Sequence, residues 1–344
     1  MRKPHLIASP RLMGLLIVLI LALTVPAIAQ DQDNEPLLDP DAPRFEVADD
    51  LTIAALRKLD IEGSDVLIEE VLEDGDNYSR YIASYESEGN TIYGLLTIPH
   101  GDVPEDGFKA IVFNHGYIPP KLYRTTERYV DYVDQLARNG FVVFKIDMRG
   151  HGRSEGDAIG SYFSPGYTID AISALRSLQN MDIIDPDGIG MWGHSMAGNL
   201  VLRAMLIEPD VQAGVIWAGA VYSYDDFMTY SISDTSFVRD EESPGARRSS
   251  AIFETYGRPD TSVPFWKAVS LTEHIAFLDA PVQLHHALDD TVVDVGYARD
   301  LVRVLDANEQ AYELHEYAAG GHNIGAPSFD EAMARTIAFF KANL

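Results

Sequence analysis

The sequence predicts an α/β domain with a mostly parallel central sheet and helices on both of its faces. Residues 78–87 and 91–98 are rich in β-forming side chains and meet at a Ser-Glu-Gly-Asn segment, which is typical of an antiparallel hairpin. Beyond this pair, short apolar runs alternate with amphipathic stretches. Apolar runs of this kind are typical of parallel strands that are buried on both faces by the helices connecting them.

The individual elements follow from this alternation. A short helix is expected over Thr52–Leu59, ahead of the hairpin. The strands expected after the hairpin are Ala110–Phe113, Phe141–Ile146, Gly188–Trp192, Ala213–Trp217, Pro281–His286 and Ala311–Tyr317. The helices expected between and after them are Tyr123–Asn139, Tyr167–Gln179, Met196–Ile207, Gly296–Asp306 and Phe329–Leu344. A single domain over residues 51–344 accounts for all of these elements.

One connection within this domain is much longer than the others. From Val221 to Ala280, about sixty residues separate two predicted strands, where a handful would connect them. We expect residues 221–280 to form an insertion, a lid over the carboxyl ends of the strands. Its aromatic side chains either line a substrate pocket or form the core of the insertion itself. They are Tyr222, Tyr224, Phe227, Phe237, Phe253, Phe265 and Trp266.

The first residues have the features of a secretory signal. Three basic side chains precede the apolar run Leu12–Val25, and Ala27-Ile28-Ala29 suits signal peptidase. The alternative is an uncleaved membrane anchor, but fourteen helical residues span only about 21 Å of a hydrocarbon core about 30 Å thick. We therefore expect a signal peptide at residues 1–29, no stable membrane anchor after its cleavage, and a secreted or periplasmic protein. Residues 30–50 are acidic and polar, and we expect them to form a flexible tether.

Composition and charge exclude several classes of function. The chain of 344 residues holds 26 basic and 53 acidic side chains, for a formal net charge of −27. Phosphate binding needs clustered Lys and Arg, so nucleic acid is not an expected partner. The chain contains no Cys, which excludes disulfides, thiolate metal sites and a Cys nucleophile.

A candidate nucleophile follows the predicted strand at residues 188–192. The segment Gly193-His194-Ser195-Met196-Ala197 has the pattern of a nucleophile elbow, in which Ser occupies a sharp turn between a strand and a helix. Close packing of strand and helix requires small residues two before and two after the Ser, as Gly193 and Ala197 are. The alternative, a Ser that merely caps a helix, does not explain the partner residues found later in the chain.

A Ser hydroxyl needs a base that accepts its proton, and the base needs a carboxylate that orients it. His322 is the best candidate base because it lies in a Gly-rich loop between the last predicted strand and the C-terminal helix. The carboxylate should follow the strand at residues 281–286, where Asp289 and Asp290 are adjacent. Asp225 and Asp226, after the preceding strand, are a more remote alternative. The chain order Ser, Asp, His is that of the α/β-hydrolase triad.

Two backbone amides are candidate donors to the oxyanion of a tetrahedral intermediate. The N–H of Met196 begins the helix after the nucleophile. The second candidate is the N–H of Tyr117, in the loop after the strand at residues 110–113, where Gly116 allows a close backbone approach. A further Gly-containing loop, Asp147–Ser154, lacks the spacing of a phosphate-binding loop, so we expect it to be structural.

Together these residues resemble the α/β-hydrolase superfamily over about residues 78–344, and within it the prolyl-oligopeptidase (S9) catalytic domain and its dienelactone-hydrolase and esterase relatives. The loop Asp147–Ser154 and the Asn-His-Gly-Tyr loop are similar to superfamily patterns. The segment Val282–Val292 is similar to the family's His-Gly-x-x-Asp-x-x-Val segment, with His285 at the position of its His. This resemblance implies that the catalytic acid is Asp289 rather than Asp290, and that His286 replaces the family's Gly.

Two hypotheses of different classes follow. The first is a secreted serine hydrolase that cleaves an ester or amide bond of a small ester or a short peptide through an acyl-enzyme. The resemblance implies an S9-type peptidase, with carboxylesterase or dienelactone-hydrolase activity as the alternative. The second hypothesis is a non-catalytic binding module on a hydrolase fold. The ordered set Ser195, Asp289 and His322 favours the first. No cofactor and no metal are expected.

Overall fold

A nine-stranded sheet runs through the computed structural model, which describes residues 44–230, 232–235 and 242–344. The expected signal peptide at residues 1–29 and the first part of the expected tether lie outside these residues. The strands are β1 (Leu67–Val71), β2 (Tyr78–Ser87), β3 (Asn90–Pro99), β4 (Phe108–Asn114), β5 (Val142–Ile146), β6 (Ile184–His194), β7 (Gly214–Trp217), β8 (Val282–Ala287) and β9 (Tyr312–Tyr317). Their order across the sheet is β1-β2-β3-β5-β4-β6-β7-β8-β9.

The sheet is antiparallel at one end and parallel over the rest. Strands β1, β2, β3 and β5 pair antiparallel, whereas β5, β4, β6, β7, β8 and β9 pair parallel. The predicted hairpin is confirmed, with Ser87 opposite Asn90. The prediction of a mostly parallel sheet is also confirmed. Strand β1 was not predicted, because all five of its residues are exposed and the strand therefore lacks an alternation of buried and exposed side chains.

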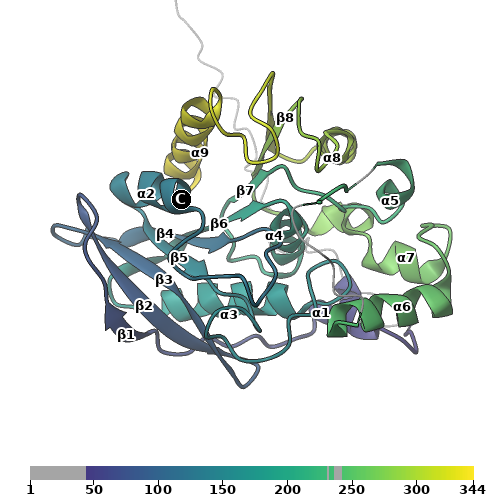
Figure 1. Ribbon diagram of the computed structural model, residues 1–344, viewed down its shortest axis with the longest axis horizontal. Helices are drawn as coiled ribbons and strands as arrows, with labels where there is room; N and C mark the ends of the chain where they lie inside the picture. Colours follow the sequence, from purple (N-terminus) through teal and green to yellow (C-terminus); the bar gives the residue numbers. More distant parts are fainter. Residues whose placement is uncertain (1–43, 231, 236–241) are drawn as a thin grey trace, which may run out of the picture. The chain divides into compact units, whose positions relative to one another are not determined.

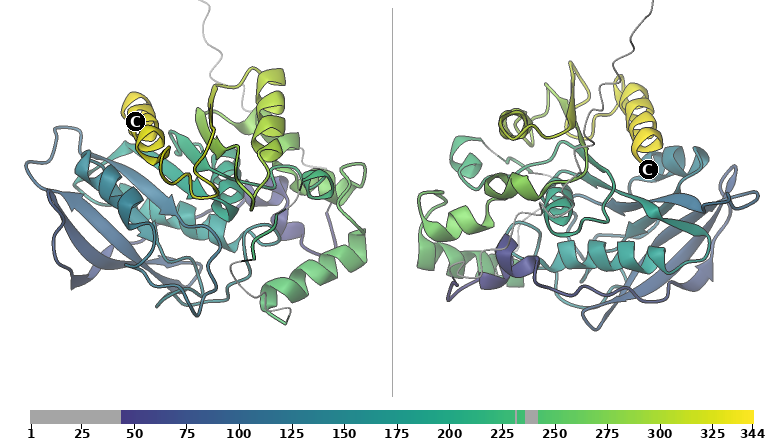
Figure 2. Two further views of the ribbon diagram at one scale, coloured as in Figure 1. Left: turned by 45° about the horizontal axis from the view of Figure 1, so that its top comes forward. Right: turned by 180° about the vertical axis from the view of Figure 1, so that it is seen from behind.

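Helices cover both faces of this sheet, as predicted. They are α1 (Ile53–Leu56), α2 (Val130–Arg138), α3 (Gly166–Gln179), α4 (Met196–Ile207), α5 (Asp226–Thr229), α6 (Pro244–Tyr256), α7 (Pro264–Val269), α8 (Gly296–Ala307) and α9 (Phe329–Asn343), with 3₁₀ turns η1 (Asp49–Leu51) and η2 (Leu271–Phe277). Helices α2 and α9 contact each other on one face, and α3 and α4 contact each other on the opposite face (Figure 1). The turned views show the same two layers (Figure 2).

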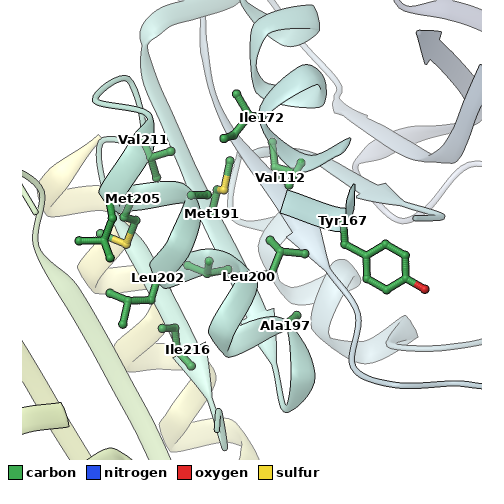
Figure 3. Close-up of a cluster of buried hydrophobic side chains, with 14 of the residues drawn as sticks. Val112, Tyr167, Ile172, Met191, Ala197, Leu200, Leu202, Met205, Val211 and Ile216 are labelled. Carbon is green, nitrogen blue, oxygen red and sulfur yellow. The ribbon is translucent and has the colours of Figure 1, made fainter. Parts of the chain in front are cut away.

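The core between α4 and the sheet explains the apolar character of both. Met191 of β6 and Ile216 of β7 are buried against Leu200 of α4 (Figure 3). On β6 the neighbouring residue, Trp192, faces the opposite side of the sheet and is also fully buried. Because both faces of the strand are covered, the strand reads in sequence as a continuous apolar run.

The insertion at residues 221–280 contains α5, α6 and α7, which lie together beside the sheet (Figure 1), and η2, which contacts α4 and α8. Helix α6 begins where the Ser243 side chain accepts a hydrogen bond from the N–H of Ala246, with Pro at the first helical position. Contacts with the loops after β5 and β8 attach the insertion to the end of the domain where these parallel strands finish. Phe253 packs edge-on against Phe163, in the loop after β5, and Ile232 forms a β-bridge with Val293, after β8.

The aromatic side chains of the insertion join the main core of the domain. Tyr222, Tyr224, Phe265 and Trp266 are all buried. Phe253 is partly exposed, at 38%. Phe237 lies outside the described residues. The four buried rings therefore serve in packing, but they pack in the common core of the domain and not in a separate core of the insertion.

The structure differs from the predicted tether over residues 44–50. Phe45 packs edge-on against Tyr256 and Phe265 of the insertion, with ring centroids 6.1 and 5.4 Å apart. The backbone N–H of Val47 donates to the Tyr256 hydroxyl, which in turn donates to the Val47 carbonyl. This stretch is acidic in composition, yet apolar packing, backbone hydrogen bonds and the ion pair of Asp50 with Arg248 attach it to the domain.

The loop after β5 is structural, as predicted for Asp147–Ser154. Arg149 donates from its backbone N–H and its guanidinium to Asp170 of α3, at distances of 2.7–3.1 Å. The Ser87 hydroxyl donates to the same carboxylate. The Asp170 side chain is fully buried, so its charge is balanced chiefly by the Arg149 guanidinium. At the start of the loop, Asp147 accepts hydrogen bonds from Tyr123 and from Thr125.

Replacing Asp170 by Ala should destabilise the protein by about 3–5 kcal/mol, because it leaves the mostly buried Arg149 guanidinium with only the half-exposed Glu88 carboxylate as an ionic partner. Chemical denaturation measures this loss. Arg138→Ala is the matched control, since the ion pairs of Arg138 with Asp76 and Asp134 lie at the surface and should contribute less than about 1 kcal/mol. Equal losses in the two variants would contradict the structural role of the buried pair.

Candidate active site

The predicted nucleophile lies in a strained turn between β6 and α4. Strand β6 ends at His194 and α4 begins at Met196, so Ser195 alone makes the connection. Its backbone has φ 56° and ψ −118°, a conformation that residues with a side chain rarely adopt. The Ser195 N–H donates to the carbonyl of Trp217 on β7, which fixes the turn against the sheet.

Small residues around this turn are required by contact distances. A Cβ atom on Gly193 would lie 2.7 Å from the carbonyl oxygen of Ala197, and one on Gly198 would lie 2.6 Å from the Cα of Gly219. Both distances are shorter than real Cβ contacts. The elbow predicted from the sequence is therefore present, and its glycines allow α4 to approach the sheet.

The structure brings the predicted base to the predicted nucleophile. His322 lies between β9 and α9, and its Nε2 is 2.9 Å from the Ser195 Oγ. The His322 side chain is 18% exposed, so the pair lies at the surface of the domain rather than in its core. The hydroxyl can therefore give its proton to the imidazole over a single hydrogen bond.

The predicted carboxylate is wrong by one residue. The Nδ1 of His322 is 2.9 Å from Oδ2 of Asp290, and not from Asp289. Asp290 is held by the backbone N–H groups of Val292 and Val293, which donate to its Oδ1. These two bonds leave Oδ2 for the imidazole. Ser195, His322 and Asp290 thus form one continuous series of hydrogen bonds.

Asp289 has a different contact. Its carboxylate accepts hydrogen bonds from the N–H groups of Gly320 and Gly321, at 3.3 and 2.8 Å. These glycines directly precede His322, so Asp289 holds the backbone of the loop that carries the base. Asp225 and Asp226 do not take the position of the acid either, since Asp225 accepts from Thr261 within the insertion and Asp226 begins α5.

The error has a physical origin in the register of β8. His286, rather than His285, lies four residues before the acid and near it, with its Nε2 3.4 Å from the Asp290 Oδ2. His285 points to the opposite face, where its Nδ1 bonds the Tyr317 hydroxyl. A shift of one residue along a strand reverses the face of every side chain. His286, and not His285, therefore corresponds to the His of the family segment, and Ala287 takes the position of the family's Gly.

The surroundings of Asp290 keep it ionised. Its side chain is only 1% exposed, and burial alone would raise its pKa. Hydrogen bonds with His286 and His322, the charge of His322 and the N–H of Val293 outweigh burial and hold the pKa of Asp290 well below its usual range. An ionised carboxylate at this position accepts the Nδ1 proton of His322 and so orients the imidazole towards Ser195.

The two predicted oxyanion donors belong to two segments that lie next to the nucleophile. Met196 is the first residue of α4, and the first N–H groups of a helix have no acceptor within the helix. Tyr117 lies in the loop after β4, the strand next to β6 in the sheet. A Cβ atom on the preceding Gly116 would lie 3.2 Å from the carbonyl oxygen of His194, which places this loop against the elbow. The donor roles of Met196 and Tyr117 stay predictions.

The described residues contain no cluster of three or more His, Asp or Glu side chains that is arranged to hold a metal ion. Among the same residues, no helix has the length and apolar character needed to cross a membrane.

Sequence comparison relates the chain to serine peptidases. Residues 107–240 match the family model described as serine aminopeptidase, S33. The chain is 23% identical over 290 residues to the probable dipeptidyl-aminopeptidase B of Aspergillus terreus (strain NIH 2624 / FGSC A1156), an alignment that covers 77% of this chain and 29% of that protein. It therefore spans less than a third of the length of this curated relative.

Comparison with solved structures gives both esterases and peptidases. Acetyl xylan esterase 1 from Thermoanaerobacterium sp. JW/SL YS485 superposes with a TM-score of 0.61 at 16% identity, over 86% of this chain and 95% of that one. Dipeptidyl peptidase 4 from Porphyromonas gingivalis superposes with a TM-score of 0.61 at 18% identity, over 78% of this chain and 36% of that one. At these identities the likeness establishes the fold.

The fold prediction from the sequence is thereby confirmed. A mostly parallel sheet with helices on both faces, a Ser at a strand-to-helix elbow and the match to a serine aminopeptidase family model all agree. The chain has the fold of the α/β-hydrolases with which it superposes, and residues 107–240 match a serine aminopeptidase family model.

Proposed function

We propose that this protein is a serine hydrolase that cleaves an ester or amide bond through an acyl-enzyme on Ser195. The observation that carries the proposal is the uninterrupted series Ser195–His322–Asp290, with 2.9 Å at each of its two hydrogen bonds. A binding module would have no use for a strained Ser aligned with a base and a buried carboxylate.

In the first step, Ser195 attacks the carbonyl carbon of the substrate. Its Oγ forms the new bond while His322 Nε2 accepts the hydroxyl proton. Asp290 remains ionised and holds the Nδ1 proton of the resulting imidazolium. The N–H groups of Met196 and Tyr117 donate to the oxyanion of the tetrahedral intermediate.

In the second step, the intermediate collapses. The carbonyl re-forms, the bond to the leaving group breaks, and His322 gives its proton to the departing alcohol or amine. Water then attacks the acyl-enzyme, again with His322 as the base, and releases the acid and the free Ser195. The protein ends each cycle unchanged, which is consistent with a site that needs no co-substrate other than water.

The substrate is a small ester or a short peptide. The relatives named as peptidases and those named as esterases represent both bond types on one fold. S9-type peptidase activity is the first candidate because of the dipeptidyl peptidase relatives, and carboxylesterase activity is the second because of the acetyl xylan esterase likeness. The signal-like sequence at residues 1–29 supports action outside the cytoplasm.

Ser195→Ala should lower kcat on the order of 10⁶-fold, since removing the nucleophile of such a site has about this effect. The measurement uses a series of p-nitrophenyl esters together with Gly-Pro- and Ala-p-nitroanilides. Anilide cleavage that depends on Ser195 would identify a peptidase, and ester cleavage alone would identify an esterase. A Ser195→Ala variant that keeps most of its activity on every substrate would refute the proposal.

A pair of variants distinguishes the two adjacent carboxylates. Asp290→Asn should lower kcat about 10⁴-fold, because an amide holds the imidazole in the wrong tautomer. Asp289→Asn should reduce kcat less than about tenfold, because an amide oxygen still accepts from the Gly320 and Gly321 amides. The rate of Ser195 labelling by a fluorophosphonate should follow the same order. The reverse order would show that Asp289 is the catalytic acid.

A further inference from the structure

A series of partly buried polar groups connects the loop after β4, which carries the predicted oxyanion donor Tyr117, to the loop after β9, which carries His322. The N–H of Gly116 is 2.9 Å from the Tyr129 hydroxyl, and this hydroxyl is 2.8 Å from Nδ1 of His194. The Nε2 of His194 is 2.9 Å from the carbonyl oxygen of His322. Tyr129 directly precedes α2 and His194 directly precedes Ser195, so three segments distant in sequence meet here.

With a neutral imidazole at His194, only one arrangement of hydrogens satisfies all three contacts. A carbonyl oxygen can only accept, so His194 must carry its proton on Nε2 and donate it to His322. Nδ1 of His194 is then an acceptor, and the Tyr129 hydroxyl must donate to it. The hydroxyl oxygen of Tyr129 in turn accepts from the Gly116 N–H. All donors in this series of hydrogen bonds therefore point in one direction, from Gly116 towards the backbone of His322.

The surroundings favour these protonation states. His194 is 3% exposed, and burial together with the charge of His322 lowers its pKa to about 3, so the ring is neutral near pH 7. Burial raises the pKa of Tyr129 well above its usual value, so its hydroxyl keeps its proton. Neither group is therefore available as the base of the reaction, and both act as neutral hydrogen-bonding groups.

The backbone around Tyr129 is strained in a way that serves these contacts. The sequence predicts a helix from Tyr123, but α2 begins only at Val130 because Tyr129 has a left-handed backbone, with φ 58°. Its ring packs edge-on against Phe113 and Trp192. A Cβ atom on Gly116 would lie 2.9 Å from the Tyr129 hydroxyl, so this glycine is required for the contact. Strain of this kind persists only where surrounding contacts determine it.

We propose that Tyr129 and His194 are positioning residues, which fix the oxyanion loop and the His322 backbone relative to each other and to Ser195. This inference rests on the proposed function. Because the Gly116 N–H is committed to Tyr129, it is not available to an oxyanion, which agrees with the prediction of Tyr117 as the donor of this loop. We call this series of hydrogen bonds through Tyr129 and His194 the link. Because the link positions the catalytic groups and does not bind substrate, its loss should lower kcat and change KM little.

Tyr129→Phe tests the link because it removes the hydroxyl and retains the ring. On the best p-nitrophenyl ester, kcat should fall about tenfold to a hundredfold with KM within about twofold. Tyr78→Phe is the matched control, since the buried Tyr78 donates its hydroxyl to Asp134 of the same helix, α2, away from the site. The control should keep its kcat, and thermal unfolding compares the stability of the two variants.

A second pair of variants separates the hydrogen bond from packing. His194→Gln retains an N–H donor on a side chain of similar reach, whereas His194→Met fills similar space without one. The Gln variant should keep a kcat at least about fivefold above that of the Met variant, because it can still donate to the His322 carbonyl. In the wild-type protein, ¹⁵N NMR of the imidazole should show a neutral His194 with its proton on Nε2.

These experiments distinguish a failure of the link from a failure of the proposed function. If the wild-type protein neither turns over any substrate nor reacts with a fluorophosphonate at Ser195, the proposed function fails. If the wild-type protein is active but Tyr129→Phe retains the kcat of Tyr78→Phe, the link fails and the function stands. Equal kcat values for the Gln and Met variants, or a proton on Nδ1 of His194, would also overturn the link.

Discussion

The left-handed backbone of Ser195 is the constraint on which the rest of the site depends. A conformation of this kind costs on the order of 1–3 kcal/mol and survives only when neighbouring contacts determine it. Here β7 accepts the Ser195 N–H, and Gly193 and Gly198 let the chain pass close to α4 and to Gly219. The strained turn presents the hydroxyl where β6 ends, beside the loops that follow the neighbouring strands.

The loop that carries His322 is held from several directions. Asp289 accepts from the two N–H groups before it, and His194 binds the carbonyl of His322 itself. The Tyr132 hydroxyl of α2 donates to the carbonyl of the next residue, Asn323. A flexible, Gly-rich loop thereby becomes a fixed support for an imidazole, and the fixed geometry is what a general base requires. Asp289, which the resemblance implied to be the catalytic acid, therefore supports the backbone of this loop and does not bind the imidazole.

The composition of the insertion does not decide how its aromatic side chains are used. Its rings are numerous enough either to line a pocket or to build a small core. The structure buries Tyr222, Tyr224, Phe265 and Trp266, because short helices such as α5 and α7 need tertiary contacts to be stable. The same requirement explains the attachment of residues 44–50, whose Phe45 completes the aromatic cluster of Tyr256 and Phe265.

The sequence by itself determined the fold class, the elbow at Ser195 and the choice of His322, because apolar periodicity and turn chemistry are local properties of the chain. Helix α4 begins at Met196, as the elbow pattern predicted. Only the tertiary structure decided between Asp289 and Asp290, since adjacent carboxylates are equivalent in sequence and differ in the direction that a strand end gives them. It alone also revealed Tyr129 and His194 as neighbours, because their contact joins segments 65 residues apart.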